Sequence, residues 1–285
     1  MFRIILIMTV VCRAYGTGIW FRAPHQLDPL LKSGEFQPEF VLLKTGIFSR
    51  HGFLKDLHDD RNVAKLCHVG IPTIAWVTHR LSPNETLSAE VGAHLGKALS
   101  ASLGKTCITE VELNIEPMPS PPIWVFAFIK SAKSELGRLK LRLTVPFVTE
   151  SSIKGFHWGA KSAEKTSEVV DGIDILNYDS GCTATGCYIR LLNEGLDFAH
   201  YLLQKQANSS IIFGLPAYHD KTNLHHESVE NPSVALQALR QYKKAKEVVC
   251  HGRFRIAFYA GWTMTASDKE YASQIQNWKK SLCTK

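Results

Sequence analysis

Acidic and amide side chains alternate with apolar ones in the stretch Ile108–Pro119, which reads I-T-E-V-E-L-N-I-E-P-M-P. This near period-2 alternation predicts a β-strand. Its polar face carries three glutamates and one asparagine before Pro117 ends it. A surface strand would carry Lys, Thr or Ser, so the acidic face indicates a barrel wall whose inner surface or upper rim holds catalytic groups. Glu116, the last residue before the proline, is the candidate general acid/base.

Further apolar or alternating stretches are predicted as strands at Thr17–Pro24, Gln37–Phe48, Gly70–Thr78, Leu139–Thr149, Val170–Tyr178, Ser209–Tyr218 and Arg255–Trp262. Helices are predicted at Asp56–Cys67, Thr86–Leu103, Pro121–Leu136, Ala160–Val170, Gly186–Lys205, Pro232–Lys246 and Asp268–Leu282. Strands that alternate with helices imply a parallel sheet, and this number of units fits a closed (β/α)8 barrel. An open doubly wound sheet is the rival, but no Gly-rich phosphate loop follows the first strand. We predict an α/β TIM barrel in one domain, without a large insertion domain.

In such a barrel the active site lies at the carboxyl ends of the strands. The residues that close the predicted strands are Arg22, Lys44, His79, Glu116, Thr149, Glu150, Tyr178, Asp179, Tyr218, His219, Asp220 and Trp262. Carboxylates, hydroxyl donors and an aromatic face for a pyranose ring make this set suited to sugars.

A resemblance to a known family becomes visible in these strand ends. E-L-N-I-E-P resembles the fourth strand of the family 18 glycoside hydrolases, the chitinase-like barrels, whose pattern is D-G-x-D-x-D-x-E. Three later segments resemble family motifs in the same order. They are Ile173–Asp179 (sixth-strand M-x-Y-D), Phe213–Tyr218 (seventh-strand G-x-P-x-Y) and Phe258–Trp262 (the eighth strand, with a Trp at the sugar subsite). The resemblance covers roughly the second half of the chain.

The resemblance implies substrate-assisted hydrolysis, in which the 2-acetamido oxygen of the sugar attacks the anomeric carbon and Glu116 protonates the leaving oxygen. It also implies that Asn114 and Tyr178 position the acetamide. The residues expected to contact the sugar are Glu112, Asp179, Tyr218 and Trp262.

The chain also departs from the family pattern. The third-strand S-x-G-G signature is replaced by I-A-W-V-T-H, and Thr109-Glu110 stands for the D-G opening. Asn114 replaces an Asp and supplies no negative charge. Family 85 endo-β-N-acetylglucosaminidases resemble this chain here, since they use Asn-x-Glu with the same chemistry.

Three functions therefore stay open. The leading hypothesis is an exported glycoside hydrolase that cleaves an N-acetylglucosamine-containing glycan, such as chitin, peptidoglycan or an N-glycan core. The second is a non-catalytic, chitinase-like carbohydrate-binding protein, which the loss of the Asp at Asn114 motivates. The third is a two-carboxylate glycosidase that pairs Glu116 with Asp179 or Asp220.

The N-terminus has the features of a secretory signal peptide: a basic residue, the apolar run Ile4–Val11 and the small-x-small end Ala14-Tyr15-Gly16. We predict a signal peptide over residues 1–16 and the barrel domain over 17–285. Acylation of Cys12 is the alternative, but no small residue stands just before it. Because no other segment is long and apolar enough to cross a membrane, we expect a secreted or periplasmic protein.

The other six cysteines form an even set, which in an exported protein indicates disulfides. Cys182 and Cys187 are the best local pair, and the remaining pairings stay open. Their spacing lacks CxxC, so no metal site is expected. The net charge of +7 is spread over scattered Lys and Arg without a nucleic-acid-binding motif. We expect a monomer that needs no cofactor and whose partner is a carbohydrate polymer.

Overall fold

The structure is a computed structural model that describes residues 16–26, 29, 32, 34, 36–55, 63, 67, 70–118, 122–151, 157–205, 209–219 and 224–284. Residues 1–15 of the predicted signal peptide lie outside these ranges. So do Asp220 and most of the helix predicted at Asp56–Cys67.

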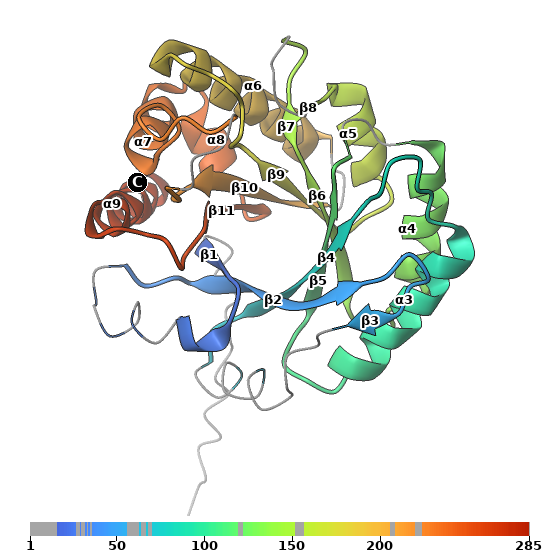
Figure 1. The fold of residues 1–285 in the computed structure, drawn as a ribbon. Coiled ribbons are helices and arrows are strands. Elements are labelled where there is room, and N and C mark those ends of the chain that lie inside the picture. Colours follow the sequence, from blue (N-terminus) through green and yellow to red (C-terminus); the bar gives the residue numbers. More distant parts are fainter. Residues whose placement is uncertain are drawn as a thin grey trace, which may run out of the picture.

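Parallel strands close into a barrel with helices around it (Figure 1). Around the barrel the order is β1-β2-β4-β5-β6-β9-β10-β11, and β11 pairs with β1 to close it. The strands are β1 (Thr17–Phe21), β2 (Phe40–Phe48), β4 (Thr73–Arg80), β5 (Glu110–Glu116), β6 (Lys140–Val145), β9 (Gly172–Leu176), β10 (Ser210–Pro216) and β11 (Phe254–Tyr259). Each overlaps one predicted strand, so the predicted TIM barrel is confirmed.

The helices outside the barrel are α3 (Ala89–Leu103), α4 (Ile123–Glu135), α5 (Ala160–Ser167), α6 (Thr185–Gln204), α7 (Pro232–Gln241), α8 (Ala245–Val249) and α9 (Ala266–Cys283). The helix predicted at Pro232–Lys246 is wrong in one respect. It is two helices, because the backbone of Tyr242 is extended and interrupts it. The remaining short elements are η1 (Pro24–Gln26), β3 (Leu54–Lys55), which pairs with β2, and β7 (Phe147–Val148), which pairs with β8 (His157–Trp158).

Alternate residues of β5 face opposite sides of the barrel wall. Val111 and Leu113 belong to the large apolar core between strands and helices. Glu112 and Asn114 are also buried, but Glu112 accepts a hydrogen bond from Trp20 Nε1 at 3.2 Å, and Trp20 belongs to a separate apolar cluster inside the barrel. The polar face of this strand therefore points into the barrel, as its alternation predicts.

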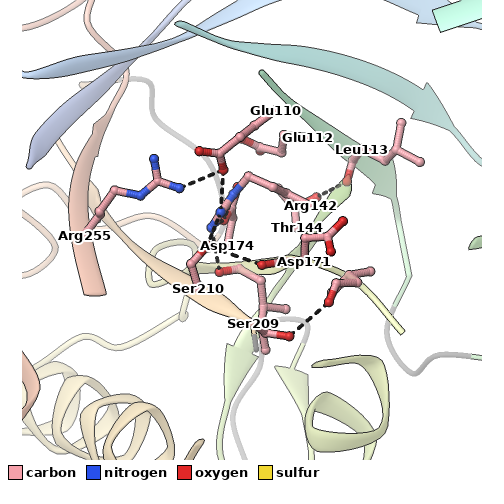
Figure 2. A network of polar contacts seen from close by, with 12 residues as sticks. Glu110, Glu112, Leu113, Arg142, Thr144, Asp171, Asp174, Ser209, Ser210 and Arg255 are labelled. Atoms are coloured by element: carbon pink, nitrogen blue, oxygen red, sulfur yellow. Dashed lines mark hydrogen bonds and ion pairs between the residues drawn. The ribbon is translucent and has the colours of Figure 1, made fainter. Parts of the chain in front are cut away.

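A network of charged side chains fills the lower part of the barrel (Figure 2). Arg142, fully buried, donates to both Asp174 and Glu110 at 2.8 Å, and Arg255 reaches the same Glu110 oxygen at 2.8 Å. Burial, followed by the neighbouring Asp174 carboxylate, raises the pKa of Glu112 well above its usual range, which favours its protonated form. Two arginines thus balance two carboxylates, with a neutral Glu112 beside them.

Disulfides join Cys67 to Cys107, Cys182 to Cys187 and Cys250 to Cys283. The prediction of disulfides and of the local pair is confirmed. Three disulfides in one chain agree with an oxidising, extracellular environment. Among the described residues, no helix combines the length and the apolar character needed to cross a bilayer.

Candidate functional site at the barrel mouth

Glu116 ends β5 at the mouth of the barrel and is exposed, whereas Asn114 below it is buried. Thr144 Oγ1 donates to Asn114 Oδ1 at 2.8 Å. The Asn114 side chain is also a hydrogen-bonding neighbour of the Glu116 carboxyl and acts to lower its pKa. The predicted pair therefore forms one hydrogen-bonded unit whose upper member meets solvent.

The pKa of Glu116 is raised above its ordinary value. Burial of the carboxyl, which disfavours its charged form, is the largest cause, and the nearby Asp179 carboxylate adds to it. The hydrogen bond from Asn114 and the positive charge of Arg80 oppose the shift. Glu116 is nevertheless exposed as a residue, so it combines access to a ligand with a pKa shifted upward from its ordinary value. A general acid needs both properties.

Tyr259, the last residue of β11, is the centre of an aromatic cluster beside Glu116. Its ring stacks on Tyr178 with centroids 4.9 Å apart. Tyr218 and Trp262 meet the same ring edge-on at 5.5 and 5.4 Å. Sequence reasoning chose Trp262 as the platform and missed Tyr259. The signal was available, because Tyr259 continues the inward-facing alternation of β11 from Arg255.

Asp179 lies between Tyr218 and the buried Glu230. Tyr218 Oη donates to Asp179 Oδ1 at 2.6 Å. The backbone N–H groups of Asp179 and Ser180 donate to Glu230 at 2.7 and 2.9 Å, and Glu230 is 1% exposed. Asp179 has φ 58°, a left-handed conformation that the two bonds from its loop to Glu230 hold. Glu230 was not predicted.

Burial also raises the pKa values of Tyr178 and Tyr218. Both phenols therefore stay protonated at any ordinary pH and can donate hydrogen bonds. For Tyr178 the neighbouring Tyr259 and the charges of Glu116 and Asp179 raise the pKa in the same direction.

Two histidines near the barrel mouth have carboxylate and aromatic partners. His219 contacts Glu227 at 2.6 Å and Asp268 at 2.7 Å. Burial alone would lower the pKa of His219, but the hydrogen bonds to these two carboxylates raise it. His225 stacks on Tyr218 with centroids 4.0 Å apart. Within the part of the chain that the structure describes, no three His, Cys, Asp or Glu residues are grouped to hold a metal ion.

A cavity of about 270 Å³ lies beside Glu116, between the loops that follow β4 and β5. Leu81 N donates to the backbone carbonyl of Glu116 at 2.7 Å, which joins the cavity wall to the end of β5. The lining is mostly apolar and consists of Leu81, Ser82, Pro83, Asn84, Glu85, Pro117, Met118, Pro122 and Trp124.

Most of the residues predicted for the site meet at the mouth: Glu116, Asn114, Tyr178, Asp179, Tyr218 and Trp262. Glu112 does not, because it lies one layer lower, fully buried and bonded to Trp20. The arrangement offers one exposed acid, an amide, phenol donors and aromatic faces, which together can hold and protonate a sugar.

No protein-family model matches the sequence, and no curated protein matches it either. Solved structures do. The spore cortex-lytic enzyme SleL of Bacillus megaterium has a TM-score of 0.61 at 11% identity, over 92% of this chain and 73% of that one. A GH18 chitinase of Flavobacterium johnsoniae has a TM-score of 0.55 at 12% identity, over 94% of both chains. A xylanase-α-amylase inhibitor protein, solved in complex with trehalose, has a TM-score of 0.56 at 11% identity, over 94% and 98%.

At such identities the likeness shows the fold. This chain has the GH18-like TIM barrel that chitinases and SleL share, which confirms the resemblance seen in the strand motifs. The same fold also carries an inhibitor protein, so the fold by itself does not assign an activity.

Proposed function

We propose that this chain is a glycoside hydrolase that cleaves an N-acetylglucosamine-containing glycan by substrate-assisted, retaining hydrolysis. The observation that carries the proposal is Glu116, an exposed residue at the end of a barrel strand whose carboxyl has a raised pKa. Its bond to Asn114 and its electrostatic contact with Tyr178 supply the rest of the machinery that the chemistry needs.

In this mechanism protonated Glu116 donates its proton to the glycosidic oxygen as the leaving group departs. The acetamide oxygen of the sugar itself attacks the anomeric carbon and forms an oxazolinium ion. Tyr178 donates a hydrogen bond to the acetamide, and the Asn114 side chain fixes its orientation. Glu116, now a carboxylate, activates the water that opens the oxazolinium ring, so the anomeric configuration is retained.

The test compares wild type with Glu116→Gln on N-acetylglucosaminyl oligosaccharides. We expect a loss of kcat of about 10²- to 10⁴-fold, the usual contribution of a general acid. An active wild type with an unaffected Glu116→Gln variant would sink the assignment. Proton NMR of the first product anomer is the second readout. Inversion would instead favour a two-carboxylate mechanism that pairs Glu116 with Asp179.

The alternative is a carbohydrate-binding protein without activity. Asn114 favours it, because an amide cannot supply the negative charge that stabilises an oxazolinium ion. The inhibitor protein that shares the fold was solved with a sugar, trehalose. Intact N-acetylglucosamine oligomers bound at Tyr259 and Trp262 after prolonged incubation with wild type would support this alternative.

We also propose that the chain is exported and that residues 1–16 are removed. The three disulfides support export. N-terminal sequencing of protein recovered from a secreting host is expected to begin at Thr17.

A further inference from the structure

His225 is a buried histidine in the loop between β10 and α7, and it contacts both Tyr218 of the candidate site and the buried Glu230. Its Nε2 lies 3.1 Å from the backbone carbonyl oxygen of Tyr218, and its Nδ1 lies 3.2 Å from Glu230 Oε2. The imidazole ring also stacks on the Tyr218 ring, with centroids 4.0 Å apart. The proposed mechanism does not use this histidine.

Both ring nitrogens of His225 face hydrogen-bond acceptors. A backbone carbonyl can only accept, so Nε2 carries a proton. Glu230 acts as an acceptor too, because the backbone N–H groups of Asp179 and Ser180 and the Ser180 hydroxyl all donate to it. Hydrogen bonds of this kind favour an ionised carboxylate, so Nδ1 of His225 donates as well. With a proton on each nitrogen the ring is an imidazolium, and the buried Glu230 carboxylate balances its charge.

The contacts of His225 close a ring of four residues at the barrel mouth. Tyr218 Oη donates to Asp179 Oδ1 at 2.6 Å, and the backbone N–H of Asp179 donates to Glu230 at 2.7 Å. His225 then joins Glu230 to the backbone of Tyr218, which completes the ring. The loops that follow β9 and β10 are therefore fastened together through buried polar contacts, which hold their positions firmly when every member is paired.

Asp179 is the member of this ring that acts on the candidate acid. After burial of the carboxyl, which is the largest cause, the Asp179 carboxylate also raises the pKa of Glu116. The other charged or titratable neighbours act differently. Arg80 lowers the pKa of Glu116, whereas Tyr178 and Tyr259 are phenols whose own pKa values are raised, so they stay neutral. The position of Asp179 therefore helps to keep a proton on Glu116.

We propose that His225 is a positioning residue of the candidate site, an imidazolium whose two N–H groups hold the Asp179 carboxylate in place beside Glu116. It acts through Glu230, which binds the backbone of Asp179, and through Tyr218, which binds its side chain. The left-handed backbone of Asp179, with φ 58°, is unfavourable for a residue other than glycine and needs such a support. The inference rests on the proposed function for the role of Glu116 as the general acid.

Titration of the Glu116 carboxyl, followed by ¹³C NMR, tests the proposal without requiring activity. In His225→Gln the new side chain has its donors on one nitrogen and carries no charge, so it cannot serve both acceptors and Asp179 loses its fixed position. We expect the titration midpoint of Glu116 to fall by about 0.5–1 pH unit toward its ordinary value. The alkaline limb of the kcat/KM profile should move to lower pH by the same amount, since a general acid works in its protonated form.

The variant Asp179→Asn removes the charge itself and provides the reference. It should lower the Glu116 midpoint by at least as much as His225→Gln does. Because His225 acts through Asp179, the double variant should show the shift of Asp179→Asn alone. Shifts that add in the double variant, or an unchanged midpoint in His225→Gln, would overturn the proposal.

His200→Gln is the matched control for a general loss of stability. His200 is similarly buried and contacts the Glu247 carboxylate at 2.8 Å. It lies near the end of α6, which follows β9 and returns the chain toward the amino end of the barrel. This variant should lower Tm and leave the Glu116 midpoint unchanged. His225→Phe is the second test variant, because it keeps a flat ring to stack on Tyr218 but has neither donor, and it should shift the midpoint as His225→Gln does.

A measurement on the wild type depends on no variant. The ¹⁵N chemical shifts of the His225 ring at about pH 7 should show a proton on both nitrogens, and a single protonated nitrogen would refute the imidazolium.

Hydrolysis assays on N-acetylglucosaminyl oligosaccharides separate this inference from the proposed function. No cleavage by wild type, together with a lowered Glu116 midpoint in His225→Gln, would refute the hydrolase and leave the positioning role of His225 standing. Cleavage by wild type with an unchanged midpoint in the variant would do the reverse.

Discussion

The two ends of β5 carry the same side chain in opposite environments. Glu110, at the lower end, lies against Arg142 and Arg255; burial alone would raise its pKa, but the two guanidinium groups lower it to about 2. At the upper end, the charge of Arg80 acts to lower the pKa of Glu116, but burial, the largest cause, and the Asp179 carboxylate raise it. Both residues belong to the same inward row of one strand.

The difference shows that depth in the barrel and the available partners decide what an inward carboxylate can do. At the lower end the charges are balanced within a closed network, so the groups hold strands together (Figure 2). At the upper end Glu116 is exposed as a residue and has the Asn114 amide as a hydrogen-bonding neighbour, so it is placed to exchange a proton with a ligand. The lower half of β5 therefore stabilises the barrel, and its upper half carries the candidate reactive group.

The largest expected effect comes from removing Arg142, the central cation of the buried charge network at the lower end of β5. Arg142→Met should destabilise the protein by about 3–5 kcal/mol, because it leaves the Asp174 and Glu110 carboxylates buried without their main partner. Urea unfolding measures the change. Arg80→Gln at the mouth is the control, and its cost should stay below about 1 kcal/mol because Arg80 is exposed. Equal costs for both variants would contradict the contrast between the two ends.

The pH dependence of stability gives a second, slightly smaller effect. The pKa of Glu110 is about 2 in the folded protein and ordinarily 4.5. Its stabilisation is therefore present above pH 4.5 and lost as the pH falls toward 2. The difference corresponds to about 3 kcal/mol. Glu110→Gln should flatten the acid limb of the stability curve, as measured by chemical unfolding at several pH values.

Glu112 belongs to the same network, but its effect on the pH dependence of stability has the opposite sign. Its folded pKa is raised, so its contribution is full below its ordinary value and declines as the pH rises. Glu112→Gln should therefore gain stability relative to wild type as the pH increases. If both variants shift the curve in the same direction, the assignment of a charged Glu110 and a neutral Glu112 is wrong.

Much of this fold could be predicted because alternation is a local signal. In each barrel strand, as in β5, a few alternating residues show which side chains face into the barrel. The carboxyl ends of parallel strands also meet at one face of the barrel. The site residues at strand ends follow from that rule. The disulfide between Cys182 and Cys187 was equally accessible, since the two residues are neighbours in the chain.

The features of the site that could not be predicted depend on contacts between segments that are far apart in the sequence. Glu230 reaches Asp179 across 51 residues, and nothing near it in the sequence marks it as the support of that loop. Glu112 comes four residues before Glu116 in β5, and its partner Trp20 lies 92 residues away in the sequence. Tyr259 was missed for a different reason, because the resemblance of F-Y-A-G-W to a family motif directed attention to Trp262.

The variant Glu230→Gln tests whether the loop at Asp179, at the mouth of the barrel, depends on the buried Glu230 carboxylate for its shape. Glu230→Gln replaces one acceptor oxygen by a donor and leaves a buried N–H of Asp179 or Ser180 unsatisfied, at a cost of about 1–3 kcal/mol. We expect this loss in thermal unfolding together with weaker glycan binding. Glu227→Gln is the matched control, because that carboxylate is 54% exposed and contacts the surface-accessible ring of His219. Unchanged binding in Glu230→Gln would show that the loop keeps its shape without this acid.

The smallest expected change is also the one that separates enzyme from binding protein. Asn114→Asp adds a carboxylate that can still accept from the Thr144 hydroxyl, and it supplies the negative charge an oxazolinium ion needs. A favourable charge of this kind is expected to raise kcat about tenfold, equivalent to about 1.4 kcal/mol. The new charge also raises the pKa of Glu116 further, so the alkaline limb of the pH–rate profile should move to higher pH.

The double variant Asn114→Asp with Glu116→Gln should show no gain, because no acid is left to protonate the leaving oxygen. If Asn114→Asp stays inactive while glycan binding is kept, the upper half of β5 holds a sugar without cleaving it.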